Sequence, residues 1–393
     1  MARIQMTTRP LFFHIDTGSF GGGSKMLLRL LTSLPDEFDP ILLAQKDGEL
    51  PFRANSQGID VEIIPFRPPL DTYDHGLFSL PFWKKAAACL RILQFNLEAR
   101  RALADADVIW CQNLRAVLTL APLSTIFRKP VIWNVGLGME SEEVVTYLNE
   151  FAFRVCDYVF IESTDQADQL FTDTQRQRFE EKFVTFHKGI DTDEFDPRAA
   201  EPNLSGSALK VGTAASLVPR KGLDVFVEAA AKVDDKLEND VQFYIAGTVP
   251  ETRNSCYAER MKELIKRHDL SDRFTLLGWV EDMPAYLKSL DVFVHPSNAE
   301  GIPGAVREAM AMEVPVVATD VGGTADAVAD GEVGYLVPPR DPDALAMAIR
   351  TLLDDEEVRR EMGTKGRRRV LRQFSIEQYV AKYSRFLRKV ATT

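Results

Sequence analysis

Short apolar runs alternate with amphipathic segments along the whole chain, and this alternation limits the possible folds more than any other feature. In the first half, residues 11–13, 41–43 and 108–110 are apolar throughout and are typical of buried strands. Residues 25–34, by contrast, carry apolar side chains at helical spacing. A strand that is apolar on both sides needs cover on both faces, which a parallel sheet between two layers of helices supplies. The sequence therefore predicts an α/β protein with parallel sheets.

The same alternation continues to the end of the chain. The other expected strands are residues 61–64, 131–133, 158–161, 209–214, 241–246, 274–277, 292–294, 316–318 and 335–337. The expected helices of the second half are residues 223–232, 256–267, 283–289, 342–353 and 376–389. A chain of 393 residues exceeds one ordinary core, so two domains are expected. Residues 196–207, rich in proline and small polar residues, predict a linker between domains at 1–196 and 208–375.

Charge and cysteine content exclude several classes of protein. The formal net charge of −11 disfavours nucleic acid as a partner, because no basic stripe offsets it. The four cysteines have neither metal-binding nor redox spacing, which favours buried thiols in a reducing compartment. The first residues have no apolar core of signal-peptide length, and no apolar window is long enough to span a bilayer. These observations predict a soluble, cytoplasmic protein without a metal site.

One stretch of the second half combines a strand with a glycine-rich turn and a helix start. The apolar run 292–294 leads into a turn through Gly301, Pro303 and Gly304, and a helix-forming segment follows. Proline suits a first helical turn, and glycine lets backbone come close to a ligand. The unpaired amides at such a helix start, together with the helix dipole, favour a phosphate group.

Two glutamates bracket this turn. Glu308 lies four residues after Gly304, and so about 6 Å further along the axis on a similar face. Its carboxylate could accept hydrogen bonds from the hydroxyls of a ribose, while Glu300 could hold hydroxyls on the other side of the phosphates. Two glutamates at this spacing also occur by chance in many chains, where they are solvated.

The surrounding residues resemble the donor-site signature of the retaining glycosyltransferases of family 4. The matching residues are Glu300-Gly301-x-Pro303-x4-Glu308-Ala309-Met310-Ala311 and Val314-Pro315-Val316-Val317-Ala318-Thr319-Asp320-x-Gly322-Gly323. The match is close from about Val211 to Phe374. The resemblance implies the GT-B fold, in which two Rossmann-like domains have parallel sheets facing a central cleft. It also implies a nucleoside-diphosphate sugar as donor, retention of anomeric configuration, no metal, no cofactor, and a final helix, residues 376–393, that crosses back to the N-terminal domain.

The resemblance extends to the other donor-site candidates. Lys221, before Gly222, would hold a phosphate, and Arg220 would replace an arginine that the family often has where Ser216 stands. The remaining donor-binding candidates are Gly301, Ile302, Pro303, Gly304, Ala305, Trp279, Val280, Gly322 and Gly323. Trp279 could equally be a half-buried core aromatic, and Gly322-Gly323 by themselves are only a tight turn.

On the acceptor side the sequence departs from the family pattern. The glycine loop Gly21-Gly22-Gly23 follows the first strand, and in the resembled family this loop faces the diphosphate and acceptor. It lacks the Gly-x-Gly-x-x-Gly spacing of a dinucleotide site. Many family members have a histidine after the strand at 131–133, where this chain has Asn134 and, two residues later, Gly136. Either residue could take the place of that histidine.

Residues 77–95 mix aromatic side chains with a basic pair. One interpretation is contact with a lipid acceptor or a membrane surface. The other is a loop that packs its aromatic side chains and is followed by an ordinary surface helix.

The sequence as a whole predicts a glycosyltransferase that moves a hexose from a UDP- or GDP-sugar to a hydroxyl acceptor, which could be a glycan, a lipid or a small molecule. Glu300, Lys221 and Arg220 are the expected catalytic residues, and Glu308 is the expected ribose ligand. Two alternatives remain open. One is a sugar-nucleotide epimerase or hydrolase on the same fold, and the other is a nucleotide-sugar-binding protein without transfer activity.

Overall fold

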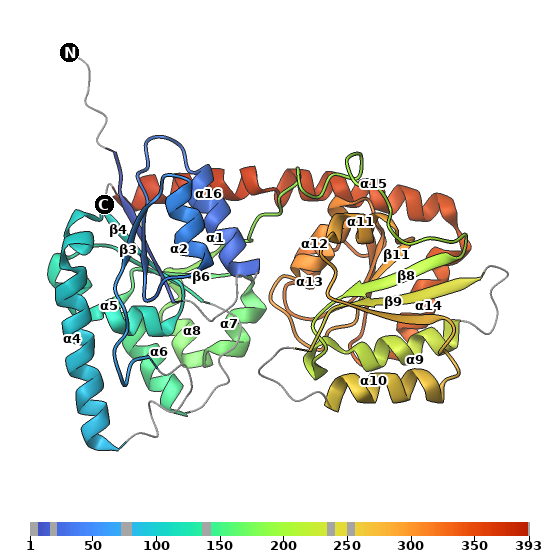
Figure 1. Ribbon diagram of the computed structural model, residues 1–393, viewed down its shortest axis with the longest axis horizontal. Coiled ribbons are helices and arrows are strands. Elements are labelled where there is room, and N and C mark those ends of the chain that lie inside the picture. The colour runs from blue at the N-terminus through green and yellow to red at the C-terminus, as the bar shows by residue number, and fades with distance from the viewer. Residues whose placement is uncertain are drawn as a thin grey trace, which may run out of the picture. The chain divides into compact units, whose positions relative to one another are not determined.

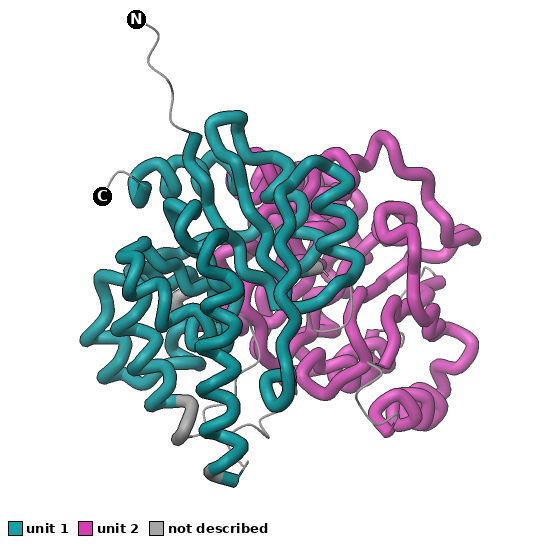
Figure 2. Tube along the Cα trace, turned by 60° about the vertical axis from the view of Figure 1, so that its left-hand side comes forward, with its two compact units in different colours: residues 1–161, 167–188, 379–393 teal, residues 162–166, 189–378 magenta. Residues whose placement is uncertain are grey.

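The chain forms two compact units, each built on its own sheet. The computed structural model describes residues 7–15, 22–71, 81–135, 143–233, 240–249 and 256–391. Unit 1 comprises residues 1–161, 167–188 and 379–393, and unit 2 comprises residues 162–166 and 189–378. Figure 2 shows the two units in different colours.

Unit 1 contains a seven-stranded parallel sheet in the order β3-β2-β1-β4-β5-β6-β7 (Figure 1). Its strands are β1 (Pro10–His14), β2 (Ile41–Ala44), β3 (Asp60–Ile63), β4 (Val108–Cys111), β5 (Val131–Asn134), β6 (Tyr158–Ile161) and β7 (Phe183–Thr185). Its helices are α1 (Gly22–Ser33), α2 (Glu49–Ser56), α4 (Phe82–Asp105), α5 (Leu114–Phe127), α6 (Glu143–Val155), α7 (Thr164–Leu170), α8 (Asp173–Arg178) and the 3₁₀ turn η1 (Glu180–Lys182). Helix α7 begins in the short segment that belongs to unit 2.

The two faces of this sheet bury alternate residues of its strands. Leu11 and Phe13 lie in a core beneath α4, α5 and α6. Phe12 points to the other face, where its ring stacks on Tyr383 at a centroid distance of 6.1 Å. Tyr383 belongs to α16 (Ile376–Ala391), whose residues from 379 onward are part of unit 1. The fully buried Tyr383 makes α16 an integral layer of this unit.

Unit 2 contains a six-stranded parallel sheet in the order β10-β9-β8-β11-β12-β13. Its strands are β8 (Leu209–Ala214), β9 (Val241–Ala246), β10 (Phe274–Gly278), β11 (Val292–His295), β12 (Val316–Thr319) and β13 (Gly334–Val337). Its helices are η2 (Pro219–Lys221), α9 (Leu223–Val233), α10 (Cys256–Arg267), α11 (Met283–Lys288), α12 (Gly304–Ala311), α13 (Thr324–Ala327), α14 (Pro342–Asp354), α15 (Glu356–Gln373) and the start of α16.

Alternate residues of β11 again divide the core of unit 2 in two. Val292 and Val294 pack with α9, α10 and α14, whereas Phe293 packs with α11, α12 and α15. Figure 1 shows α9 and α14 on one side of the sheet and α11 and α12 on the other. The doubly covered parallel sheet expected from the apolar runs is therefore present in both units.

The division of the chain differs from the expected domain boundaries. Residues 189–196 pack with unit 2, because Arg367 of α15 donates to the carbonyl of Phe195 and to the carboxylate of Asp196. The segment expected to be a linker, residues 196–207, also packs on unit 2, where the amides of Asn203 and Leu204 donate to the hydroxyl of Ser289. The backbone of this segment is therefore hydrogen-bonded to the folded unit.

Among the described residues, no helix combines the length and the hydropathy needed to cross a bilayer.

Candidate functional site

Three loops of unit 2 meet at the carboxyl edge of its sheet. Strands β8, β11 and β12 are neighbours, and all three run parallel. The loops that follow them, residues 215–222, 296–303 and 320–323, therefore lie side by side. Open α/β sheets bind ligands outside the carboxyl ends of their strands. The residues predicted to hold the phosphates and the sugar come from these three loops.

The first two loops are held together by close backbone contact. The amide of Asn298 donates to the carbonyl of Arg220 at 2.8 Å, and its side-chain amide donates to the carbonyl of Pro219 at 3.1 Å. Gly222 has φ of +60°, and a Cβ added there would lie 2.0 Å from the carbonyl oxygen of Pro296. Only glycine fits this contact, which places Lys221 beside the glutamate loop.

Substitution of Gly222 should disturb both the fold and this placement. We expect Gly222→Ala to lower the free energy of unfolding by more than the ~1–2 kcal/mol of a left-handed non-glycine residue, because the backbone contact must also open. Gly331→Ala is the matched control, since Gly331 also has positive φ but nothing within 4 Å of an added Cβ. Urea unfolding of both variants measures the difference, and equal losses would contradict the contact.

Glu300 is the centre of the assembled loops. Its side chain is 4% exposed, yet its carboxylate has four polar neighbours. The ammonium of Lys221 lies 2.5 Å from Oε1, and the guanidinium of Arg220 lies 3.3 Å from Oε2. The hydroxyl of Ser297 donates to Oε1 at 2.7 Å, and Nε2 of His295 lies 3.2 Å from the same atom. The carboxylate is therefore fixed in one orientation before any ligand binds.

These neighbours set the charge states in the site. Burial by itself would raise the pKa of Glu300, but the hydrogen bond from His295 and the charge of Lys221 outweigh it, so the pKa lies well below the ordinary value of 4.5. Burial lowers the pKa of His295, against the hydrogen bond with Glu300 that would raise it. At neutral pH the ring is therefore neutral, and it donates to the ionised Glu300 through Nε2–H.

The glycines after β12 support the glutamate loop from the other side. Gly322 has φ of +55°, and a Cβ there would lie 1.9 Å from the carbonyl oxygen of Glu300. The amide of Gly323 donates to the carbonyl of Gly301 at 2.7 Å. Both glycines therefore position the loop backbone, and this contact by itself accounts for the pair of glycines.

Helix α12 begins at Gly304, with Pro303 as the N-cap residue, whose side chain makes no cap hydrogen bond. The sequence predicted Pro303 in the first helical turn, and the structure places it one position earlier. A Cβ added at Gly304 would lie 3.7 Å from Oε1 of Glu308. The half-buried carboxylate of Glu308 thus reaches back to the helix start, while the side chain of Ile302 points into the core. Ala305 is half-exposed at the same helix end.

Residues not considered from the sequence complete the site. His295 and Ser297 are fully buried against Glu300 and come directly from the end of β11 and the residues after it. Thr319 donates from the end of β12 to the carbonyl of Ser297 at 2.5 Å. Nε of Arg340 lies 3.3 Å from the side-chain oxygen of Asn298. Polar residues at the carboxyl ends of otherwise apolar strands were the signal that could have identified the first three.

Trp279 lies on the same edge of the sheet but further along it. It follows β10, three strands from β11 and so about 14 Å away at the usual strand spacing. The indole is 77% exposed, which excludes the interpretation as a half-buried core aromatic, whereas Val280 packs on the core. The space between Trp279 and Glu300 along this edge is occupied by the ends of β9 and β8.

The acceptor-side candidates belong to unit 1. Gly22 and Gly23 form the start of α1, directly after the loop that follows β1. Asn134 is the last residue of β5, two strands from β1 in the same parallel sheet. Gly21 and Gly136 lie outside the described residues. Among the residues that the structure describes, no cluster of His, Cys, Asp and Glu is arranged to hold a metal ion.

Comparison with known proteins shows what this chain is similar to. Residues 197–369 match the family described as "Glycosyl transferases group 1". HepE of Anabaena, solved in complex with UDP, has 19% sequence identity and a TM-score of 0.77, covering 97% of this chain and 100% of its own. Sucrose-phosphate synthase of Thermosynechococcus elongatus has 20% identity and a TM-score of 0.73, covering 98% of this chain and 99% of its own. The fold is therefore GT-B.

Two curated glycosyltransferases are similar to this chain over part of their length. The capsular polysaccharide biosynthesis glycosyltransferase CapM of Staphylococcus aureus is 31% identical over 183 residues, which are 46% of this chain and 47% of CapM. A GDP-mannose-dependent α-(1-6)-phosphatidylinositol monomannoside mannosyltransferase of Mycobacterium tuberculosis is 31% identical over 215 residues, 51% of this chain and 54% of its own length. The chain thus matches about half the length of these relatives. The similarity to group 1 glycosyltransferases lies in the segment 197–369.

Proposed function

We propose that the protein transfers a hexose from a nucleoside-diphosphate sugar to a hydroxyl acceptor with retention of anomeric configuration. The observation that carries this proposal is the buried Glu300 carboxylate held against Lys221, beside the uncapped start of α12. A fixed anion, a cation and a helix start at one strand edge are the groups that a sugar diphosphate requires. The curated relatives named above are glycosyltransferases, which supports the same reading.

In this proposal each group of unit 2 acts on one part of the donor. The bond from the anomeric carbon to the diphosphate breaks, a bond to the acceptor oxygen forms on the same face of the sugar, and the proton of the acceptor hydroxyl passes to the leaving diphosphate. Lys221, Arg220 and the amides at Gly304 stabilise the negative charge of the leaving diphosphate. Glu300 orients the sugar and Glu308 the ribose. The backbone near Trp279 and Val280 is the proposed contact for the base, while Gly301, Pro303, Ala305, Gly322 and Gly323 shape the pocket around the phosphates.

The acceptor would approach residues of unit 1. We propose that Gly22, Gly23 and Asn134 contribute to its binding, since they lie at the carboxyl ends of two strands of that sheet. The uncharged Asn134 cannot supply the positive charge of a protonated histidine at that position. This difference favours a second candidate function, in which the protein binds or hydrolyses nucleotide sugars without transfer.

A panel of donors tests the proposal and its alternatives. Purified protein is titrated with UDP, GDP and ADP, and then incubated with the corresponding sugar nucleotides, alone and with lipid and glycan extracts. Mass spectrometry of the products is expected to show an added hexose only when an acceptor is present, and NMR of that product is expected to show the anomeric configuration of the donor. Free sugar or an epimer without acceptor would support the hydrolase or epimerase, and binding without any product would support the binding protein.

The proposed chemistry does not depend on a divalent cation. We expect transfer to proceed at an unchanged rate in EDTA, because Lys221 and Arg220 supply the positive charge that a metal would otherwise provide. Initial rates with EDTA and with added magnesium or manganese measure this. If EDTA stopped transfer and either metal restored it, the assignment of Lys221 as the phosphate cation would be wrong.

A further inference from the structure

Helix α4 carries an apolar stripe on its outward face. Trp83, Leu90 and Leu97 follow one another at intervals of seven residues and are 69%, 67% and 61% exposed. The exposed Ala86 and the 50% exposed Leu93 fill the intervals at spacings of three and four. This spacing places all five side chains in one line along the helix. The opposite side of α4 is the buried one, with Ala88, Phe95, Ala99 and Ala102 against the unit 1 core.

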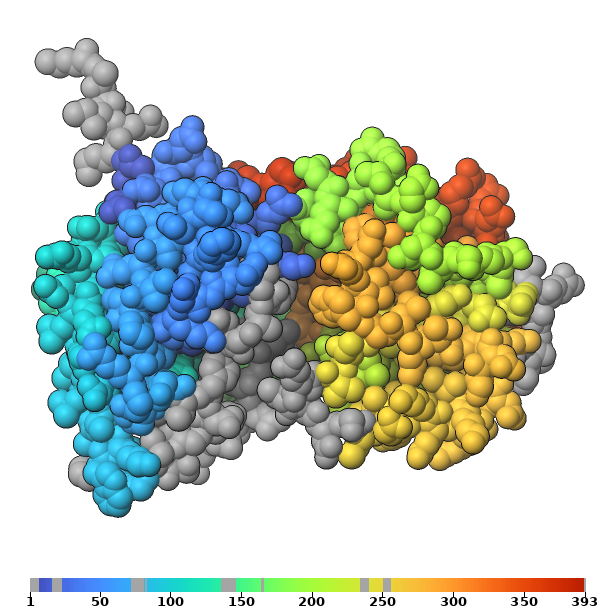
Figure 3. All heavy atoms as spheres, viewed as in Figure 1, coloured from blue at the N-terminus to red at the C-terminus, as the bar shows by residue number. Residues whose placement is uncertain are grey.

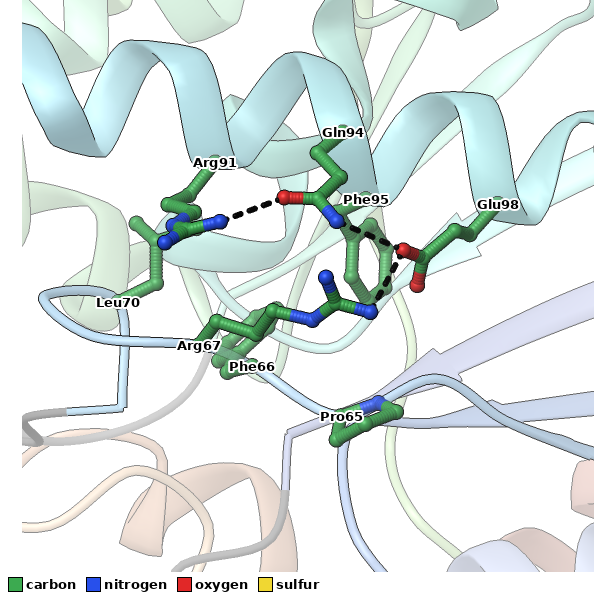
Figure 4. Close-up of a pocket in the computed structure, with 8 residues that line it drawn as sticks. All are labelled: Pro65, Phe66, Arg67, Leu70, Arg91, Gln94, Phe95 and Glu98. Atoms are coloured by element: carbon green, nitrogen blue, oxygen red, sulfur yellow. Dashed lines mark hydrogen bonds and ion pairs between the residues drawn. The ribbon is translucent and has the colours of Figure 1, made fainter.

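Positive charge accompanies the stripe. Five cations of α4, Lys84, Lys85, Arg91, Arg100 and Arg101, stand against two acids, Glu98 and Asp105, so the helix carries 5 − 2 = +3 in a chain of net charge −11. Glu98 is moreover neutralised, because it accepts from Arg67 at 3.0 Å and from Gln94 at 3.1 Å (Figure 4). Helix α4 therefore carries net positive charge as well as an apolar stripe, in an otherwise acidic protein.

Helix α4 is held against the core of unit 1 by aromatic contacts. The Phe66 and Phe95 rings pack edge to face with centroids 5.2 Å apart, and Phe95 also contacts Phe13 of β1. Figure 4 shows the turn at residues 65–70 lying against the middle of α4, where Arg67 reaches Glu98. These contacts lie on the buried side and on one flank, and they leave the stripe outside.

The first turns of α4 project beyond the sheet of unit 1. The helix has 24 residues, about 36 Å, whereas the four residues of β4 span about 13 Å. Because α4 ends at Asp105, just before β4 begins, the excess length lies toward the carboxyl edge of the strands. Figures 1 and 3 show this end of the helix reaching past the rest of the unit, at its surface. Gly22 and Asn134 lie at the same edge.

We propose that the outward face of α4 docks on the surface of an anionic lipid bilayer. Trp83, Leu90 and Leu93 would enter the boundary between headgroups and acyl chains, and Lys84 and Lys85 would lie against lipid phosphates. Tryptophan prefers this boundary because its ring is apolar and its N–H is polar. The protein would thereby present the carboxyl edge of the unit 1 sheet toward the membrane. This inference stands on α4 alone and does not require the proposed transferase activity.

A second copy of the chain fits the same face less well. The stripe from residue 83 to residue 97 is about 22 Å long and about 10 Å wide, which is well under the ~800 Å² per partner of a stable interface. Two such faces would also bring cations against cations in two proteins that already repel each other at −11. An anionic bilayer, by contrast, matches both the charge and the apolar stripe.

Co-sedimentation of the full chain with vesicles tests the proposal. We expect binding to phosphatidylcholine vesicles that contain phosphatidylglycerol, and little binding to phosphatidylcholine alone. The double variant Trp83→Ser/Leu90→Ser should bind at least about tenfold less. The double variant Lys84→Gln/Lys85→Gln should bind about 25-fold less, about fivefold for each cation. Both should unfold at the wild-type temperature, because the side chains are exposed.

Phe52→Ser is the matched control, since Phe52 is equally exposed at 69% on α2 of the same unit. Its vesicle binding should equal that of the wild type. Wild-type protein that ignores anionic vesicles, or α4 variants that bind them as the wild type does, would overturn the proposal. So would a wild-type dimer in analytical ultracentrifugation that Trp83→Ser/Leu90→Ser converts to monomer, because the stripe would then belong to a second copy.

Discussion

Replacement of Lys221 by alanine is expected to weaken the binding of a nucleoside diphosphate by about 10- to 100-fold. A charge-assisted contact to phosphate contributes roughly 1.5–3 kcal/mol, which corresponds to one to two decades of affinity. Transfer should slow as well, because the same cation stabilises the leaving diphosphate. Isothermal titration with the preferred nucleoside diphosphate and steady-state kinetics measure the two effects.

The control for this variant is Lys232→Ala. Lys232 lies on α9 of the same unit and pairs with Asp343 at the surface, away from the three loops. Its replacement removes a lysine charge without touching the site, so affinity should be unchanged. If Lys221→Ala kept the wild-type affinity in a folded protein, Lys221 would not be the phosphate cation.

The Lys221 variant should also show an altered dependence of stability on pH. In the wild type the folded protein lowers the pKa of Glu300, so its ionisation stabilises the fold above the ordinary value of 4.5, and this stability is lost as the pH falls below it. Without Lys221 the pKa of Glu300 rises toward that value. The unfolding temperature of the variant should therefore fall less steeply on acidification than that of the wild type.

The two glutamates are expected to have separable effects on catalysis. Glu308 is proposed to hold the ribose, which is bound in both the ground state and the transition state, so Glu308→Gln should mainly raise the KM for the donor. Glu300 lies beside the proposed sugar position, where positive charge develops as the bond breaks. A carboxylate there acts more strongly in the transition state, so Glu300→Gln should mainly lower kcat, by about 100-fold or more.

Titration with nucleoside diphosphate alone separates these roles, because this ligand lacks the sugar. The affinity of Glu308→Gln should fall, whereas that of Glu300→Gln should hold or rise, since Lys221 is then released from its 2.5 Å ion pair. If affinity were lost only in Glu300→Gln, the donor would lie along the loop and α12 in the direction opposite to the one proposed here. Glutamine is the appropriate substitute because it keeps the size of the side chain in this buried position.

The sheets could be predicted from local sequence because their strands are apolar on both sides. Residues 292–294 bury both faces in the structure, as their composition required. Helix α4 was predicted only in part, because its outward leucines break the pattern of one apolar and one polar face. Helix α15 was missed for the opposite reason, since only a few of its residues, among them Met362 and Val370, are buried.

The site could be predicted as a set of residues but not as an arrangement. The glycine, proline and glutamate spacing identified Glu300 and Glu308, which lie in one segment. Lys221 and Glu300 are 79 positions apart, and their ion pair depends on the neighbouring places of β8 and β11 in the sheet. Their position at or just after the end of an apolar strand could have marked His295 and Ser297 as candidates, but no spacing in the sequence shows that both contact Glu300.

The position of Tyr383 constrains the order in which the protein can be made. Tyr383 is fully buried in unit 1, where its ring contacts Phe12 near the beginning of the chain and Phe160 on β6. On the ribosome, residues 7–188 would emerge long before this part of α16 exists, so the part of their sheet that α16 covers stays exposed during synthesis. Most of unit 2 is the continuous segment 189–378, which can fold as it appears. The segment translated second would therefore be the first to reach its final form, and the exposed Phe12 and Phe160 would be candidates for chaperone contact in the interval.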